Sequence, residues 1–129
     1  MNGARFLLDT NVLIGFLGGA KWAADFFERT SAKKPEYLVS AVTRMELLGF
    51  PGITEEEEGR VAALLARLEP VPIDTQVEEA AISLRRTGNL KLPDAIIAAT
   101  ALTRKAALVT ADEDFKKVPD LEVVNPRRP

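Results

Sequence analysis

The sequence predicts an α/β fold in which parallel strands are joined by helices. Two observations support this class. Short apolar runs alternate with longer segments of helical periodicity, which is the pattern of strands connected by crossover helices. The 129 residues are 47% hydrophobic and 28% charged, which is ordinary for a soluble globular protein with one core. We therefore expect a single domain over residues 1–124, followed by a C-terminal tail at 125–129.

In the first part of the chain, the apolar runs Ala4 to Leu8 and Tyr37 to Ser40 predict two strands. Between them, Lys21 to Thr30 has the apolar spacing of a helix. We expect the helix after the second strand to end at Gly49, with Pro51 just beyond it, because these residues do not continue a helix readily.

Capping signals mark two helices in the middle of the chain. Thr54 to Glu57 forms an S/T-x-x-E capping box ahead of an apolar helical pattern. Thr75 to Glu78 repeats the box, and we expect its helix to end at Gly88 in a left-handed cap. Between these helices, Val71 to Ile73 predicts a brief third strand.

The last part of the chain completes the alternation. Pro93 fits the first position of another helix, because its missing N–H is not needed there. The runs Ala107 to Thr110 and Glu122 to Val124 are the fourth and fifth predicted strands.

Composition excludes several classes of chemistry. The chain has no cysteine, which rules out disulfides, zinc thiolates and thiol nucleophiles and suits a reducing cytosol. It also has no histidine, so any reaction must use carboxylates, hydroxyls, Lys or Arg. A net charge of -2 counts against indiscriminate nucleic-acid binding, although a local basic patch stays open. Neither a signal peptide nor a membrane span is evident, and we expect a cytoplasmic protein.

Four acids occupy places that solubility does not explain. Each follows or interrupts an apolar stretch, where an unpaired carboxylate would cost several kcal/mol or lose its charge. Functional groups of open α/β sheets gather beyond the carboxyl ends of the strands, and all four could meet there. These acids are Asp9, Glu46, Asp94 and Asp112.

Each acid also has a structural explanation. Asp9 could cap the helix that follows it, and Asp112 could cap a short helix over Glu113 to Lys117. Asp94 could favour the helix dipole, whereas Glu46 has only the role of an exposed side chain on an apolar helix. Four coincidences at one sheet edge favour a shared site instead. A carboxylate cluster is stabilised by Mg²⁺ or Mn²⁺, and such a site suits phosphoryl chemistry.

Four segments together resemble the motifs of PIN domains, and especially those of VapC-type toxins of toxin–antitoxin pairs. They are Leu7 to Ile14, Arg44 to Leu48, Leu92 to Ala101 and Leu108 to Phe115. The resemblance extends from about residue 4 to residue 124. It implies a three-layer α/β/α sandwich with a mostly parallel sheet of about five strands, and a Mg²⁺- or Mn²⁺-dependent endoribonuclease.

The resemblance also implies roles for the acids. Asp9, Asp94 and Asp112 would hold the metal, and Glu46 would bind it directly or through water. All four are therefore the catalytic candidates. The fourth motif offers Asp114 as an alternative to Asp112; we favour Asp112 as the ligand and Asp114 as its outer support.

Polar and basic neighbours complete the predicted site. By the same resemblance, Asn11 and Thr110 match polar positions of the family that orient the acids, as neighbours of metal ligands commonly do. Arg44 and Lys91 are the favoured candidates for steering substrate phosphates, although solubility alone explains most surface cations. Further candidates of the same kind are Arg85, Arg86, Lys116 and Lys117.

The resulting hypothesis is hydrolysis of a phosphodiester in single-stranded or looped RNA, which leaves 5'-phosphate and 3'-hydroxyl ends. The resemblance further implies a small antitoxin whose helical tail binds an apolar groove, and a homodimer. Three rivals stay open: a receiver-like signalling domain with an acidic pocket, a module that binds RNA or a partner without cutting, and a small-molecule phosphatase. DNA also stays open as a substrate.

Overall fold

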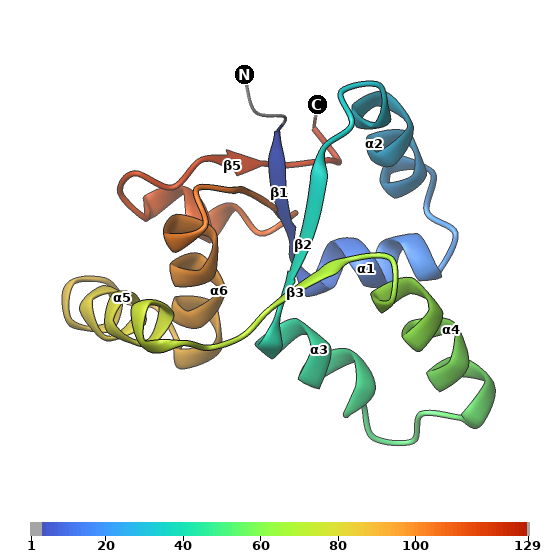
Figure 1. Cartoon of the computed structure of the whole chain (residues 1–129), viewed down its shortest axis with the longest axis horizontal. Helices are drawn as coiled ribbons and strands as arrows, with labels where there is room; N and C mark the ends of the chain where they lie inside the picture. The colour runs from blue at the N-terminus through green and yellow to red at the C-terminus, as the bar shows by residue number, and fades with distance from the viewer. Residues whose placement is uncertain (1–3, 129) are drawn as a thin grey trace.

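The computed structural model describes residues 4–128, which form a five-stranded parallel sheet of order β3-β2-β1-β4-β5 (Figure 1). This confirms the predicted α/β class. The strands are β1 (Arg5–Leu8), β2 (Glu36–Ser40), β3 (Glu69–Val71), β4 (Ala107–Val109) and β5 (Val123–Val124).

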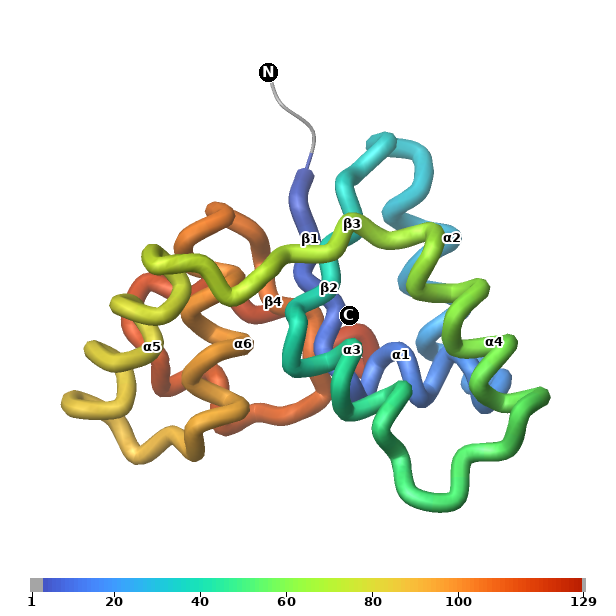
Figure 2. The backbone as a smooth tube through the Cα atoms, turned by 60° about the horizontal axis from the view of Figure 1, so that its bottom comes forward, coloured from blue at the N-terminus to red at the C-terminus, as the bar shows by residue number. Residues whose placement is uncertain are grey.

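Helices cover both faces of the sheet and make the expected three layers. Figures 1 and 2 place α5 and α6 on one side of the sheet and α1, α2 and α4 on the other. The helices in the described part of the chain are α1 (Thr10–Leu17), α2 (Lys21–Ser31), α3 (Ala41–Leu48), α4 (Glu55–Leu65), α5 (Thr75–Thr87), α6 (Leu92–Thr103) and the 3₁₀ helix η1 (Glu113–Lys117). None of the helices within residues 4–128 has the length and apolar character needed to cross a membrane.

The strands are apolar on both faces because each face meets helices. Successive side chains of a strand point to opposite sides, so neighbouring residues enter different cores. Leu7 packs in the core beneath α5 and α6, whereas Leu8 packs in the core shared with α1, α2 and α4. Leu38 and Leu108 lie beside Leu7 in register and enter the same core. Short continuous apolar runs are therefore the correct signal for these strands.

The third strand was predicted two residues too late. It spans Glu69–Val71, paired with the end of β2, and not Val71 to Ile73. Pro70 is tolerated because β3 is an edge strand, where one side of the backbone needs no partner. Ile73 lies outside the strand and is exposed.

The helix α5 ends at Gly88, as predicted, but its first cap and the conformation of Gly88 differ from the prediction. The capping residue is Asp74, whose carboxylate accepts from the Val77 N–H at 2.9 Å, and Thr75 is the first helical residue. Asp ranks slightly above Thr as a cap, which explains the choice. Gly88 follows the helix with φ -125° and ψ 171°, an extended and not a left-handed conformation.

The other signals for helix ends agree more closely with the structure. The capping box of Thr54 and Glu57 is present, with both reciprocal hydrogen bonds. Gly49 ends α3, as predicted. Pro93 lies in the first turn of α6 but one position later than expected, because the helix begins at Leu92.

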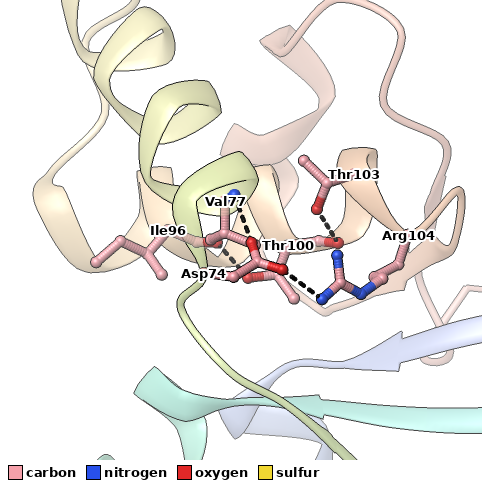
Figure 3. A network of polar contacts seen from close by, with 6 residues as sticks. All are labelled: Asp74, Val77, Ile96, Thr100, Thr103 and Arg104. Atoms are coloured by element: carbon pink, nitrogen blue, oxygen red, sulfur yellow. Dashed lines mark hydrogen bonds and ion pairs between the residues drawn. The ribbon is translucent and has the colours of Figure 1, made fainter.

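An ion pair joins the start of α5 to the end of α6. Besides capping α5, Asp74 accepts from the Arg104 guanidinium at 2.9 Å (Figure 3). Thr100 and Thr103, on the same side of α6, donate to carbonyls of their own helix. The contact links α5 to α6 on this side of the sheet.

The strand order fixes where a site can form. The chain starts at the central strand β1, continues outward to β2 and β3, and then returns to β4 on the other side of β1. Ligand sites of open α/β sheets lie at such a switch point, beyond the carboxyl ends of the strands. Receiver domains share the flavodoxin-like order 2-1-3-4-5, so the observed order excludes the receiver-like alternative.

Candidate active site

The four acids approach one edge of the sheet from four different elements. Asp9 follows β1 directly and Asp112 follows β4, the two strands of the switch point. Glu46 lies on α3 and Asp94 in the first turn of α6, two helices that contact each other. The carboxylates are close enough for the charges of Asp94 and Glu46 to affect Asp9. The convergence that the sequence suggested is therefore present in the fold.

Asp9 is the most tightly held of these acids, with 6% of its surface exposed. Its Oδ1 accepts from the Thr10 N–H at 2.8 Å. Its Oδ2 accepts from the Thr110 hydroxyl at 2.7 Å and from Asn11 Nδ2 at 3.2 Å. Burial raises the pKa of Asp9; the hydrogen bonds from Thr110 and Thr10 oppose the rise, and the charges of Asp94 and Glu46 add to it. The carboxylate is thus fixed in one orientation.

Asn11 and Thr110, the predicted supporting residues, tie the ends of β1 and β4 together. Asn11 donates to Thr110 Oγ1 at 3.1 Å and accepts from the Ala111 N–H at 3.1 Å. Thr110 also accepts from the Asp112 N–H at 3.0 Å. These contacts place the backbone of Asp112 relative to the carboxylate of Asp9.

Asp94 is half-buried, and within residues 4–128 no hydrogen bond or ion pair holds its carboxylate. Burial is the main cause that raises the pKa of Asp94, and the charges of Asp112 and Glu46 raise it further. Lys91 opposes the rise, so its ammonium lies within electrostatic reach of the site. The surroundings of Asp94 therefore disfavour its ionised form, and Lys91 offsets this only in part.

Asp112 caps η1, because its Oδ1 accepts from the Asp114 N–H at 2.9 Å. The structural alternative considered for Asp112 is thus real. Asp114 is exposed, and its charge also raises the pKa of Asp94, which leaves both residues near the site. Asp112 is half-buried and directly bonded to the Thr110 network, which favours it as the more fixed of the pair.

Glu46 has a partner that the sequence did not suggest. The Thr10 hydroxyl donates to Glu46 Oε1 at 2.5 Å and also lies 3.0 Å from the hydroxyl of Thr43. Thr43 in turn contacts Ser40, the residue that caps α3. The only sequence signal was a Ser and a Thr three residues apart at a helix start, which is indistinguishable from ordinary capping.

The donor set suits a hard divalent cation, although the side chains are not closed around one. Within residues 4–128, no three Asp or Glu side chains are close enough to hold a metal ion as they stand. All available donors are carboxylate oxygens, the kind that Mg²⁺ and Mn²⁺ prefer, and none of the four acids forms an ion pair in this part of the chain. Glu46 is exposed and Asp94 and Asp112 half-exposed, so their side chains have room to turn inward.

The basic candidates divide by their partners. Arg44 and Lys91 are exposed and lie on α3 and at the cap of α6, the helices that carry Glu46 and Asp94. Arg85 donates to the Leu90 carbonyl at 2.9 Å, and Lys116 forms an ion pair with Glu113, so both have structural roles. The geometry keeps Arg44 and Lys91 as the better candidates for substrate contact.

Comparison with known proteins identifies relatives of this sequence and fold. Ribonuclease VapC4 from Mycobacterium tuberculosis is 35% identical over 136 residues, which cover 96% of this chain and 98% of that protein. A chain from a toxin–antitoxin complex of Klebsiella pneumoniae is 34% identical, with a TM-score of 0.78 over 93% of this chain and 96% of that one. VapBC2 from Rickettsia felis, bound to a promoter DNA fragment, shares the fold at 22% identity, with a TM-score of 0.82 over 94% and 98% of the two chains. The PIN domain family model matches residues 6–121, and the chain therefore belongs to the PIN domain family.

Proposed function

We propose that this chain is a Mg²⁺- or Mn²⁺-dependent endoribonuclease and the toxin of a toxin–antitoxin pair. The observation that carries the proposal is the meeting of Asp9, Glu46, Asp94 and Asp112 at one sheet edge, where no cationic side chain pairs with them in the described residues. Two relatives support it by name, one a ribonuclease and one part of a toxin–antitoxin complex.

In this proposal, Asp9, Asp94 and Asp112 hold the ion, and Glu46 binds it directly or through water. When bound, such an ion polarises a phosphoryl oxygen and makes water more acidic. Asp9 contributes a carboxylate that three donors have already oriented. Glu46 is held through Oε1 only, so its Oε2 is available to orient the water that attacks phosphorus.

Substrate binding falls to the cations around this edge. Lys91 is exposed and close enough to Asp94 to influence its charge, so a phosphate beside the ion would meet the Lys91 ammonium. Arg44 lies one position before Met45, on the exposed side of α3. Both residues supply a local positive contact that the overall charge of -2 does not.

The proposed partners are an antitoxin and a second copy of the chain. Exposed apolar side chains border a surface cavity of about 220 Å³ beside Glu46, formed by α1, α3, α4 and the loop between α3 and α4. An amphipathic helix of an antitoxin would find an apolar surface there. The residues that line this cavity include Ile14, Leu17, Leu47, Phe50 and Ile53.

The test is cleavage of a mixed pool of structured RNA by the purified, antitoxin-free protein. We expect cutting with Mg²⁺ or Mn²⁺, none with EDTA, and 5'-phosphate and 3'-hydroxyl ends. Asp94→Asn should lower the rate on the order of 100-fold or more, since even changes beside metal ligands cost 10–100-fold. The matched control is Asp25→Asn, which removes an exposed acid paired with Lys21 on α2 and should cut like the wild type.

The alternatives give different results in the same assay. A folded protein that binds Mn²⁺ and RNA but cuts nothing would be a binding module, and the proposal would be wrong. Hydrolysis of nucleotide monophosphates without RNA cleavage would indicate a small-molecule phosphatase. A parallel reaction with single-stranded DNA shows whether the protein requires the ribose of RNA or also cleaves a DNA backbone.

A further inference from the structure

A chain of hydroxyl groups leads from the interior of the protein to Glu46. The Thr43 N–H donates to Ser40 Oγ at 3.1 Å, and the Ser40 hydroxyl donates to Thr43 Oγ1 at 3.2 Å. The hydroxyls of Thr43 and Thr10 are 3.0 Å apart, and Thr10 Oγ1 lies 2.5 Å from Glu46 Oε1. Ser40 and Thr43 are almost fully buried, whereas Glu46 is exposed. This series of hydroxyl groups therefore connects the buried interior to the exposed side chain of Glu46.

Because each hydroxyl has a single proton, the hydrogen bonds in this series of hydroxyl groups can point in only one direction. An ionised carboxylate only accepts hydrogen bonds, so the single proton of the Thr10 hydroxyl goes to Glu46. The contact between the two threonines must then use the proton of Thr43, and the contact between Ser40 and Thr43 uses that of Ser40. Every hydroxyl proton is assigned and the series ends on the carboxylate. Reversing the contact between the two threonines would use the Thr10 proton and leave Glu46 without its donor, whereas reversing the contact between Ser40 and Thr43 would leave the two threonines without a proton between them.

Thr10 also connects two acids of the proposed site. Its backbone N–H donates to Asp9 Oδ1 at 2.8 Å, while its hydroxyl donates to Glu46. Asp9 directly follows β1 and Glu46 lies on α3, and the Thr10 hydroxyl also contacts Thr43 of the same helix. The contacts of Thr10 therefore link the positions of the two carboxylates.

We propose that Thr10 and Thr43 are positioning residues that hold Glu46 in register with Asp9. Thr10 makes the contact, and Thr43, fixed by Ser40, orients the Thr10 hydroxyl toward the carboxylate. Neither residue touches the substrate or the ion. This inference rests on the proposed function for its consequence, because Glu46 matters to the reaction only if the acids hold an ion.

The test combines Mn²⁺ affinity with the position of Glu46. Thr10→Val and Thr43→Val remove a hydroxyl with little change in shape, and each should weaken Mn²⁺ binding roughly 10-fold, as expected for groups behind a metal ligand. Thr10→Ser and Thr43→Ser retain the hydroxyl and should restore affinity to within about twofold. Crystal structures of the metal-free Val variants should show the Glu46 carboxylate displaced from its wild-type position.

Two comparisons separate positioning from general support of the fold. Thr100→Val removes an equally buried threonine hydroxyl, bonded only to the Ile96 carbonyl of its own helix, and should leave Mn²⁺ affinity unchanged. In a Glu46→Gln background, the Thr10→Val and Thr43→Val changes should cause no further loss, because residues that act through one group are not additive. Thr10 is only half-buried, so Thr10→Val keeps the test available if Thr43→Val fails to fold.

The inference is overturned if the Val variants bind Mn²⁺ like the wild type, or if they weaken binding as much in the Glu46→Gln background as alone. A wild-type protein that bound no Mn²⁺ would contradict the proposed function. The metal-free crystal structures would still decide the inference in that case: an unmoved Glu46 refutes it, and a displaced Glu46 supports it.

Discussion

At the scale of single residues, Asp9 shows that a helix cap and a metal ligand are not exclusive roles. A carboxylate has about four acceptor positions, two on each oxygen. Three are used in Asp9: one on Oδ1 by Thr10, and two on Oδ2 by Asn11 and Thr110. The remaining position is on Oδ1. The capping bond therefore orients the carboxylate and leaves one lone pair for the proposed ion, so these two explanations of Asp9 do not compete.

Asp74 makes a residue-scale prediction about pH. Its pKa is held below its ordinary value of 3.8 by the hydrogen bond from the Val77 N–H and by that from Arg104. The unfolded chain therefore takes up this proton at a higher pH than the folded chain does. The stability that Asp74 contributes is complete above 3.8 and is lost as the pH falls through the lower, folded-state value.

Thermal unfolding from pH 7 to pH 2 measures this effect. Asp74→Asn keeps a good cap but loses the charge that faces Arg104 (Figure 3). We expect the variant to melt a few degrees below the wild type at pH 7, with the difference shrinking as the pH falls below the ordinary aspartate pKa. Asp74→Ala should add a constant loss from the missing cap. A difference that stayed the same over the whole range would show that the charge is irrelevant.

At the scale of elements, the strands and helices with a clear apolar pattern could be predicted from the sequence. Four of the five strands fall within one residue of their predicted ends, because an apolar run on a doubly covered sheet leaves little choice. The edge strand β3 was misplaced because Glu69 and Pro70 are residue types that are uncommon in strands. Its place depends on pairing with β2, and pairing is information that a local pattern lacks.

Long-range contacts of the site were beyond the sequence for the same reason. The four acids could be found because each interrupts an apolar run. The hydroxyl partners of Glu46 could not, because Thr10 and Thr43 are 33 residues apart and meet only when β1 and β2 lie side by side. Thr43 also resembles any threonine in the first turn of a helix. The conformation of Gly88 was also predicted wrongly: glycine suggested a left-handed cap, but Gly88 is extended where the helix ends.

Two helical glycines give an element-scale prediction with opposite signs. A methyl group added at Gly59 in α4 would meet nothing within 4 Å, whereas one added at Gly15 in α1 would lie 2.5 Å from the ring of Trp22 on α2. We expect Gly59→Ala to stabilise the protein by about 0.5–1 kcal/mol, the usual gain of Ala over Gly in a helix. Gly15→Ala should destabilise it by about 1–3 kcal/mol, because the ring must move.

Urea unfolding followed by fluorescence measures both changes at once, since Trp22 is the sole tryptophan. Gly15→Ala should also shift the emission of the folded state, which Gly59→Ala should leave unaltered. Stabilisation by Gly15→Ala would mean that α1 and α2 separate easily, and that the close approach at Gly15 is not a constraint on their packing.

At the scale of the whole molecule, the site depends on the strand order, because the chain adds β2 and β3 on one side of β1 and then β4 and β5 on the other. The proposed ligands are separated by up to 103 residues in the chain, from Asp9 to Asp112, and they come from four elements. An unfolded chain cannot bring them together. Ion binding must therefore be linked to folding, and the stability of the whole protein reports on the site.

This linkage predicts that Mn²⁺ reverses the stability order of the wild type and Asp94→Asn. Without metal at neutral pH, the variant should melt slightly higher, because burial and the charges of Asp112 and Glu46 raise the pKa of Asp94 and so disfavour its ionised form. Solvent screens this half-exposed group, which limits the gain to less than ~1 kcal/mol. At a free Mn²⁺ concentration of 100 times Kd, the wild type should gain about 2.7 kcal/mol and the variant much less. Calorimetry in EDTA and in Mn²⁺ measures both, with Asp25→Asn expected to follow the wild type. Equal gains from Mn²⁺ in the wild type and Asp94→Asn would mean that the ion binds elsewhere, and the assignment of Asp94 as a ligand would have to be abandoned.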